Sequence, residues 1–483
     1  MMDTDACYRA ILSRDRRFDG RFYTAVVTTG IYCRPVCPAP TPERRNVRFF
    51  DCAAAAEEAG FRPCRRCRPE TAPGTPAWLG KSATIVRALR LISEGALDEG
   101  SLEELAERLG IGSRHLRRLF HEEIGASPSA VAQTRRVHFA RKLLDETKLP
   151  IAEVALGSGF GSIRRFNEVM RRSFGMTPTI LRNAAKKNRF ESDNGALSLR
   201  LPFRPPFDWE SIISFLAPRA IPGVESIKEK SYSRAFSLAG TTGILKLRPS
   251  EREPCLHLMV SASDTKGLNR IVERARKLFD CDADPLQISE CLSKDERLAP
   301  LLRARPGLRV PGAIDGFELG VRAILGQQVT VRGATTLAGR LVKAFGIPFE
   351  NGGEEEITHL FPSPDVLARA DLTIIGLPKP RAAAISALAR VVLEDPHAIE
   401  SVAGLNEVVE RLTRISGIGS WTANYIAMRA AGEPDAFPSG DLALRRAVSI
   451  RGETISVKEL EQRAEAWRPW RAYAAMHLWA SLK

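Results

Sequence analysis

Long apolar runs are missing from this sequence of 483 residues, and no stretch approaches the ~18 apolar residues that a membrane-spanning helix needs. The first residues, MMDTDACYRAILSRDRRF, contain no apolar core of a secretory signal. No low-complexity tract interrupts the chain, and aromatic residues make up only 7% of it. We therefore expect a protein of the cytoplasm with no membrane partner.

A chain of this length is too long for one hydrophobic core, so roughly three or four domains are expected. The composition, with 44% hydrophobic and 27% charged residues, is that of an ordinary globular protein. Most of the formal net charge of +14 lies within residues 1–195. This basic front half predicts a polyanionic partner, either nucleic acid or an acidic membrane surface, although a solvated basic face would give the same charge.

Cysteine is sparse, but four of the nine cysteines form two close pairs. Cys33 and Cys37 lie in TTGIYCRPVCP, and Cys64 and Cys67 lie in FRPCRRC. Disulfides are uncommon in the cytosol, and two such pairs have the spacing of a four-thiolate zinc site. The pattern predicts one bound Zn²⁺, and spacing alone leaves open a purely structural metal. The cysteines without ligand spacing are interpreted as packing residues: Cys7, Cys52, Cys255, Cys281 and Cys291.

The segments TTGIYCRPVCPA, ERRNVRFF and EEAGFRPCRRC together resemble the N-terminal domain of the Ada family, whose members sense DNA methylation. The resemblance covers about residues 5–70. It implies that Cys33 is both a zinc ligand and a nucleophile, which takes a methyl group irreversibly from a methylphosphotriester of DNA. Zinc would keep the sulfur as a thiolate at neutral pH. The same resemblance implies that Thr29 and Arg62 contact DNA.

Two similar helical units lie within residues 101–178. In SLEELAERLGIGSRHLRRLF, Ser101 and Glu104 predict a capping box, and Ser113 is expected to cap the next helix. In IAEVALGSGFGSIRRFNEVMRRSFGMTP, Ser162 is expected to open the second helix. A short helix, a glycine-containing turn and a basic helix predict a helix–turn–helix, although a plain αα-hairpin has the same outline.

The second unit resembles the AraC-type activators, with IAEVAL, GF, RF and FGMTP in order. This resemblance implies binding to promoter DNA and, for an activator, RNA polymerase as a partner. The side chains expected to face a groove or phosphates are Arg114, Arg117, Arg164 and Arg165.

The spacing of apolar residues changes in the second half of the chain. Short apolar alternations in residues 197–260 predict strands, and helical periodicity dominates from about residue 265. In LTRISGIGSWTANYIAMRA, Gly417 and Gly419 lie between two amphipathic helices, where glycines let the backbone approach a phosphate. Asp441 follows in FPSGDLALRRAV, where it also fits a plain helix N-cap.

These segments, with RPGLRVPGAIDGFELGVRAILGQQV and WRPWRAYAAMHLW, resemble the helix-hairpin-helix DNA glycosylases. The resemblance to the AlkA family of 3-methyladenine glycosylases extends over about residues 200–483. It implies hydrolysis of the N-glycosidic bond of alkylated bases in double-stranded DNA, with Asp441 stabilising an oxocarbenium-like transition state. The flipped base would enter a pocket of Trp421, Tyr425 and Trp479, whose electron-rich rings favour a cationic base.

Two positions refine this expectation. Glycosylases of this fold that also cut the backbone carry a lysine where this chain has Trp421, so a monofunctional glycosylase is expected. Gln328 occupies the wedge position, which fills the gap left by the flipped base. The Pro-Cys-His-Arg motif of the methyltransferase domain usual in Ada proteins is missing, so repair of O6-alkylguanine is not expected.

The expected architecture is multidomain, with two α+β and two all-α domains. The predicted segments are a small zinc-bound α+β and methyl-acceptor domain at 1–78, an all-α double helix–turn–helix domain at 79–185, a linker at 186–196, an AlkA-type N-terminal α+β domain at 197–305, and an all-α helix-hairpin-helix glycosylase domain at 306–483. The leading prediction is a bifunctional adaptive-response protein that excises alkylated bases and activates transcription after methyl transfer to Cys33. Two alternatives stay open: a transcription factor with a decayed glycosylase domain, and a glycosylase whose zinc domain is only structural.

Overall fold

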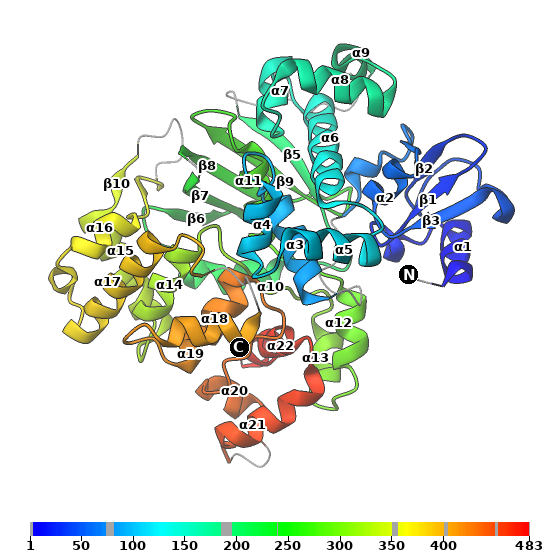
Figure 1. The fold of residues 1–483 in the computed structure, drawn as a ribbon. Coiled ribbons are helices and arrows are strands. Elements are labelled where there is room, and N and C mark those ends of the chain that lie inside the picture. Colours follow the sequence, from blue (N-terminus) through cyan, green and yellow to red (C-terminus); the bar gives the residue numbers. More distant parts are fainter. Residues whose placement is uncertain are drawn as a thin grey trace.

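The computed structural model describes residues 3–73, 82–184, 196–238, 240–349, 356–399, 404–449 and 453–482. Along the chain a small α+β unit is followed by a group of helices, a five-stranded sheet and a second, larger group of helices (Figure 1). The predicted fold classes are therefore confirmed. The predicted linker lies outside the described residues except for Ala196. Within the described ranges, no helix is both long and apolar enough to cross a bilayer.

The N-terminal unit, called the zinc unit below, contains a sheet of strand order β3-β1-β2-β4, in which only the β2–β4 pair is parallel. That parallel register pairs Tyr32 with Pro63, and it therefore brings Cys33 beside Cys64 at the ends of the two strands. The unit comprises α1 (Thr4–Ser13), β1 (Tyr23–Val26), β2 (Ile31–Cys33), β3 (Val47–Phe50), α2 (Ala53–Glu58) and β4 (Arg62–Pro63).

The next seven helices contain both predicted helix–turn–helix units, α4–α5 and α7–α8, joined by the long helix α6. Their bounds are α3 (Ala83–Ser93), α4 (Leu102–Arg108), α5 (Ser113–Glu123), α6 (Pro128–Glu146), α7 (Ile151–Gly157), α8 (Ile163–Phe174) and α9 (Pro178–Ala184). The capping box of Ser101 and Glu104 is present, and the Ser162 side chain accepts a hydrogen bond from the Arg165 N–H at 3.2 Å. The prediction for Ser113 is wrong: Ser113 is already helical, and the extended residue at the N-cap is Gly112, which has no side chain to offer.

The predicted strands of the second half form an antiparallel sheet of order β5-β9-β8-β7-β6. Alternate residues of β8 are buried, which is the period-2 pattern expected of a strand with one face on the core. The elements are β5 (Leu197–Pro202), α10 (Trp209–Leu216), β6 (Glu225–Lys228), β7 (Ser231–Leu238), β8 (Thr241–Pro249), β9 (Cys255–Ala262) and α11 (Leu268–Leu278).

In the described part of the chain after α11, one short strand pair is present, β10 (Ile347–Pro348) with β11 (His359–Leu360), and the other regular elements are helices. A single π-helical turn, Ala427–Ala431, continues α19 and is called the π-turn below. The helices are α12 (Pro285–Leu292), α13 (Leu298–Ala304), α14 (Gly316–Leu325), α15 (Val331–Phe345), α16 (Pro364–Arg369), α17 (Lys379–Glu394), α18 (Leu405–Thr413), α19 (Ser420–Ile426), α20 (Leu442–Ala447), α21 (Val457–Ala464) and α22 (Arg471–Ser481).

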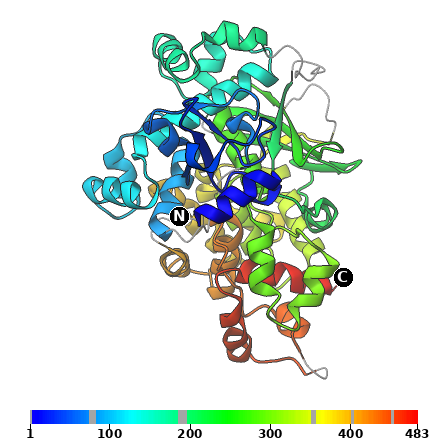
Figure 2. The ribbon, with the colours of Figure 1, turned by 90° about the vertical axis from the view of Figure 1, so that its right-hand side faces the viewer.

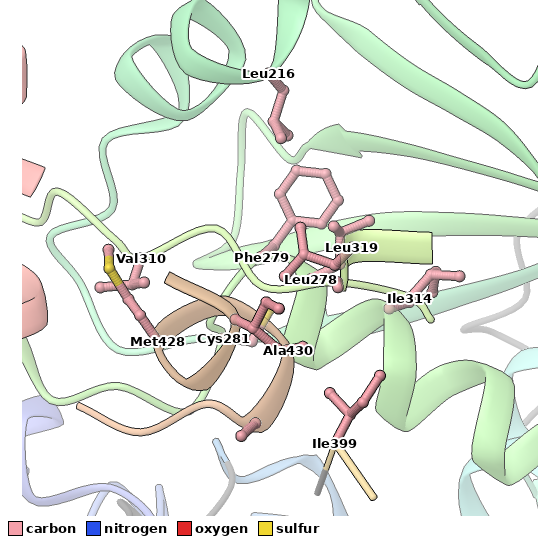
Figure 3. Packing of buried hydrophobic residues seen from close by; sticks show 14 of the residues in the cluster. Leu216, Leu278, Phe279, Cys281, Val310, Ile314, Leu319, Ile399, Met428 and Ala430 are labelled. Atoms are coloured by element: carbon pink, nitrogen blue, oxygen red, sulfur yellow. The ribbon is translucent and has the colours of Figure 1, made fainter. Parts of the chain in front are cut away.

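The hydrophobic clusters are shared between segments that are far apart in sequence. The first helix–turn–helix unit packs its Leu116 and Phe120 in one cluster with Ala54 and Ala55 of the zinc unit. The second unit, including Phe166, belongs to the large cluster that fills the sheet and the C-terminal helices, part of which is seen in Figure 3. In two views at right angles the zinc unit lies against the rest of the molecule (Figures 1 and 2). The two halves of the chain are therefore packed together.

Candidate functional sites

Four sulfur atoms converge at one end of the zinc unit. The Sγ atoms of Cys33, Cys37, Cys64 and Cys67 all lie within 4.8 Å of one another, and the Cys37 and Cys64 sulfurs are 4.0 Å apart. A tetrahedral zinc with Zn–S bonds of about 2.3 Å needs sulfurs about 3.8 Å apart, so the four residues fit the metal. The Arg34 N–H donates to the Cys67 sulfur at 3.3 Å, as suits a thiolate ligand. The predicted four-cysteine zinc site is thus confirmed.

The sulfur cluster has a buried side and an open side. Cys64 and Cys67 are buried, whereas Cys33 and Cys37 are partly exposed. Cys33 lines a cavity of about 720 Å³, together with Thr29 and Arg62, both of which are exposed. The structure thus brings the predicted methyl acceptor and the two predicted DNA contacts to one cavity, and contact with DNA stays a prediction.

The second helix–turn–helix unit borders the same cavity. Ser173 and Phe174, at the end of α8, line it, and the Phe174 carbonyl accepts a hydrogen bond from the Arg65 guanidinium at 3.2 Å. An added Cβ at Gly175 would lie 3.5 Å from Arg62 Nη1. The sequence showed no sign of this contact because the two segments are more than one hundred residues apart.

All four arginines predicted to face DNA are exposed on the second helices of the two units: Arg114 and Arg117 on α5, and Arg164 and Arg165 on α8. Two of them form surface ion pairs, Arg117 with Glu103 at 3.5 Å and Arg165 with Glu168 at 3.4 Å. Exposed pairs of this kind contribute only about 0–1 kcal/mol, so they would exchange readily for a phosphate.

A cavity of about 1200 Å³ opens among α10, α14, α15, α19, α20 and α22. It is lined by residues that stand as far apart in sequence as Phe215 and Leu482. The predicted site residues that line it are Gln328, Gly419, Trp421, Tyr425, Asp441 and Trp479. Gly417 does not line the cavity, but it lies two residues before Gly419 in the same hairpin.

The carboxylate of Asp441 is held by three N–H donors. Oδ1 accepts from the Leu444 N–H at 3.0 Å and from the Trp479 indole at 3.2 Å, and Oδ2 accepts from the Trp421 indole at 3.0 Å. The bond from Leu444 makes Asp441 the N-cap of α20. A plain helix cap needs only the bond from Leu444. The two additional indole bonds fix the orientation of the carboxylate at the wall of the cavity.

The predicted pocket aromatics lie together. Trp421 and Tyr425 stack with ring centroids 5.3 Å apart and an interplanar angle of 8°, and Trp479 meets Tyr425 edge-on at 6.3 Å. Arg429 donates to the Tyr425 hydroxyl at 2.8 Å. Burial opposes ionisation of Tyr425, but the nearby guanidiniums of Arg429 and Arg219 outweigh it, so the pKa of this phenol is lowered.

The predicted wedge residue stands at the tip of the turn between α14 and α15. Gln328 is exposed and has φ +55°, a left-handed conformation that non-glycine residues seldom adopt. Its neighbour Gln327 donates to the Gly417 carbonyl at 2.9 Å and to the Thr422 hydroxyl at 3.1 Å. Gln327 therefore connects the wedge turn to the hairpin between α18 and α19. The sequence did not predict this role, because it shows only that two glutamines follow one another.

The hairpin needs its first glycine. Gly417 has φ +88°, and a Cβ there would come within 2.6 Å of the Ala384 Cβ. Gly419 is the exposed N-cap of α19, and no atom would obstruct a Cβ at that position, so nothing blocks the approach of a ligand. The exposed backbone at this helix start is suited to a phosphate.

Three lining residues had no signal in the sequence. The Arg219 guanidinium lies 3.9 Å from the centroid of the Phe215 ring, and Arg429 lies 5.0 Å from the same centroid. Phe215 and Arg219 come from α10 and the turn after it, some two hundred residues before Tyr425. No local pattern connects segments so far apart.

Comparison with known families covers most of the chain. The family described as "Metal binding domain of Ada" matches residues 6–70. The family described as "Helix-turn-helix domain" matches residues 105–184. The family "AlkA N-terminal domain" matches residues 198–315. The family "HhH-GPD superfamily base excision DNA repair protein" matches residues 321–471. The resemblances seen in the sequence are therefore confirmed for all four parts.

Two curated relatives and one solved structure define the relationship. A Mycobacterium tuberculosis protein named probable bifunctional transcriptional activator/DNA repair enzyme AlkA is 42% identical, covering 100% of this chain and 97% of the relative. The Escherichia coli DNA-3-methyladenine glycosylase 2 is 33% identical over 58% of this chain and 95% of its own. The 3-methyladenine DNA glycosylase of Archaeoglobus fulgidus shares the fold of 58% of this chain and 96% of its own, with a TM-score of 0.52 and 24% identity. On the identity and coverage of the first relative, this chain belongs to the family of Ada–AlkA fusion proteins.

Proposed function

We propose that this protein is a bifunctional adaptive-response protein, which excises alkylated bases from double-stranded DNA and activates transcription after taking a methyl group from a DNA methylphosphotriester. Its relatives carry names for both activities. The observation that carries the glycosylase proposal is the carboxylate of Asp441, held by two indoles beside a stacked aromatic pair in one cavity.

The proposed reaction is hydrolysis of the N-glycosidic bond of 3-methyladenine and related bases. An N3- or N7-alkylated purine carries positive charge, so it leaves with the bonding electron pair as a neutral base. Asp441 stabilises the positive charge that develops at C1′, and it accepts a proton from the water that adds there. The N–H groups of Trp421 and Trp479 keep the carboxylate in place during this step.

The base must leave the duplex to reach this carboxylate. The Trp421–Tyr425 pair and Trp479 offer ring faces to the flipped purine, and their electron-rich surfaces attract its positive charge. Gln328 fills the gap in the duplex and hydrogen-bonds the orphaned base, while Gly417 and Gly419 bind the backbone phosphates. The exposed left-handed turn at Gln328 supports this assignment.

The glycosylase is proposed to be monofunctional. Trp421 has no amine, so it cannot form a Schiff base with C1′, and its indole already donates to Asp441. The expected product is an intact strand with an abasic site. Borohydride trapping of a covalent adduct on the wild-type protein would argue against this.

Substitution of Asp441 tests the glycosylase. Asp441→Asn keeps the size of the side chain and the N-cap, but it removes the charge that the transition state needs. Release of 3-methyladenine should fall by roughly 10²-fold or more, while binding to lesion DNA is retained. Release near the wild-type rate would reject Asp441 as the catalytic carboxylate. If the wild-type protein itself released no base, the alternative of a transcription factor with a decayed glycosylase domain would be favoured.

The methyl-transfer proposal rests on the open side of the sulfur cluster. The four cysteines would hold Zn²⁺, which keeps their sulfurs as thiolates at neutral pH. Cys33 Sγ attacks the methyl carbon of the phosphotriester, the C–O bond breaks, and the phosphodiester leaves as an anion. The product is a stable thioether, so each molecule reacts once.

The exposed arginines of α5 and α8 are proposed to bind promoter DNA in the cytoplasm, and RNA polymerase is the proposed partner in activation. Cys33→Ser separates the two candidate roles of the zinc unit. If labelled methyl still transfers to this variant, Cys33 is not the acceptor. If none transfers to the wild-type protein, the zinc is structural only and the chain is a glycosylase with a DNA-holding module.

A further inference from the structure

Helix α3 starts the helix–turn–helix half of the chain, and its C-terminal end has partners in both halves. Within its own half, the Arg135 guanidinium of α6 donates to the Ser93 carbonyl at 3.4 Å, and further partners come from the glycosylase half. The Ser93 carbonyl accepts from the Asn269 amide at 2.9 Å, and the Glu94 carbonyl accepts from the Arg270 guanidinium at 3.4 Å. The Glu94 carboxylate pairs with Arg274 at 3.0 Å. The last carbonyls of a helix lack partners of their own and carry partial negative charge, so these donors from α11 stabilise α3 in its place.

Two arginines of α3 also contact the helical hairpin formed by α18, α19 and the π-turn. Arg90 Nη1 donates to the carbonyl of Ala431, the last residue of the π-turn. Arg87 lies against Gly404, the N-cap of α18, where a Cβ would come within 2.9 Å of its Nη2. The segment α18–α19–π-turn is therefore contacted by α3 at both of its ends, and α3, α4 and α18 are seen close together in Figure 1.

The π-turn leads directly to the base pocket. Arg429, two residues before Ala431, is buried, with Nε donating to the Pro311 carbonyl at 2.7 Å and Nη2 to the Gly312 carbonyl at 3.1 Å. The third nitrogen of this guanidinium, Nη1, donates to the hydroxyl of Tyr425 at 2.8 Å. Tyr425 stacks on Trp421, whose indole holds Asp441, so each contact in this series fixes the next.

The two neighbours of Arg429 in the π-turn pack into the hydrophobic core. Met428 and Ala430 lie in the buried cluster with Val310 and Cys281, close to the end of α11 (Figure 3). Gly312 bonds to α11 through its N–H to the Leu278 carbonyl at 3.0 Å, and a Cβ there would meet the Lys277 carbonyl at 2.4 Å. A π-helical turn is rare and is frequently found at functional sites. Here Arg90 of α3 bonds the last residue of the turn, and the Pro311 and Gly312 carbonyls bond Arg429 within it.

We propose that Arg90 and Arg87, in the DNA-binding half of the chain, are positioning residues of the glycosylase base pocket. This inference rests on the proposed glycosylase function. By holding the end of the π-turn and the start of α18, the two arginines fix Arg429, and through Arg429 they fix the Tyr425 ring on which the flipped base stacks. The fused DNA-binding half thereby completes the support of the catalytic site.

The test uses the full-length chain and measures release of 7-methylguanine from a methylated duplex. Arg90→Met keeps an apolar stem but removes the donor to Ala431. Because one hydrogen bond of the support is lost, kcat should fall about three- to tenfold while KM for lesion DNA stays the same. Arg90→Lys keeps a donor and should restore kcat to within about twofold of the wild-type value.

Glu94→Gln is the matched control. It weakens the contact of α3 with Arg274 in the same interface but does not touch the π-turn, so its kcat should equal that of the wild type. An equal loss of kcat in Glu94→Gln and Arg90→Met would overturn the proposal, because it would show a general loss of docking. A wild-type kcat in Arg90→Met would overturn it as well.

Arg87→Met is the second variant, should Arg90→Met not fold. It acts on the other end of the hairpin segment and should also lower kcat without changing KM, and wild-type kcat in it would count against the proposal. The proposed function itself fails in a different way, because the wild-type protein would then release no base in any of these experiments.

Discussion

The indole of Trp421 is expected to contribute to catalysis through its N–H as well as its ring. Trp421→Phe removes the donor that lies 3.0 Å from Asp441 Oδ2, but it leaves an aromatic ring to stack on Tyr425. The Asp441 carboxylate then keeps two of its three donors, the Trp479 indole and the Leu444 N–H. The Oδ2 atom is released, and the carboxylate is free to turn away from the position where C1′ of the substrate would lie.

The size of the effect follows from the charge on the acceptor. A hydrogen bond to a charged group contributes about 1.5–3 kcal/mol. Each 1.36 kcal/mol in the barrier changes the rate about tenfold, so the full effect would be roughly a 10- to 100-fold loss. Because the carboxylate is charged both before and during the reaction, part of the loss falls on the ground state, and about tenfold is expected.

Single-turnover release of 3-methyladenine, measured with enzyme in excess, reports this step without product release. Trp467→Phe is the matched control, because the Trp467 indole donates to Asp295 at 2.9 Å and is not part of the cavity wall. That change should lower stability but leave the rate per folded molecule unaltered. If Trp421→Phe releases base as fast as the wild type, or if both variants slow equally, the argument from the Asp441 hydrogen bonds is refuted.

Three further predictions concern the zinc unit, the recognition helices and the C-terminal helix. Methylation of Cys33 replaces a thiolate by a neutral thioether, so promoter affinity of the zinc-loaded protein should rise roughly ten- to a hundredfold, and unchanged affinity in a titration with Cys33→Ser as control would contradict this. Arg164→Ala should weaken binding to all DNA sequences similarly and reduce the slope of log K against log salt by about 1, whereas a loss confined to one sequence would indicate base recognition instead. Burial, with Arg305 nearby, lowers the pKa of His477 from the ordinary 6.5 to about 4. The neutral ring thus favours the fold above pH 6.5, and this contribution of up to about 3 kcal/mol is lost as the pH falls through 4. Urea unfolding between pH 7 and 4 should show the loss, and His477→Gln should reduce it.

Residue spacing within short segments determined much of what could be predicted. Two cysteine pairs of fixed spacing can close tight turns around one metal, and the four sulfurs indeed lie within 4.8 Å of one another. The capping residues Ser101 and Ser162 act on donors only three residues away, so they mark helix starts without reference to the rest of the fold. At Ser113 the local signal was wrong, because the last extended residue before the helix is Gly112 and Ser113 is already helical.

Contacts between distant segments could not be predicted in this way. Asp441 fits a helix cap in the sequence, and only the packing of α19 and α22 brings the indoles of Trp421 and Trp479 to its oxygens. The same holds for Arg429, whose guanidinium bonds Tyr425 in its own helix and also the carbonyls of Pro311 and Gly312, a segment more than one hundred residues earlier. Such pairings depend on the register and crossing of whole helices, which are set by the sum of many buried contacts.

The sequence by itself therefore determined the four kinds of domain and the zinc ligands, because each is encoded by residues that lie near one another in short segments. The tertiary structure alone decided that the domains are packed together, with α3 of the DNA-binding half placed between α11 and the π-turn. The physical reason is that the charges and carbonyls that hold this interface, such as Glu94 and the Ala431 carbonyl, find their partners only after both halves have folded.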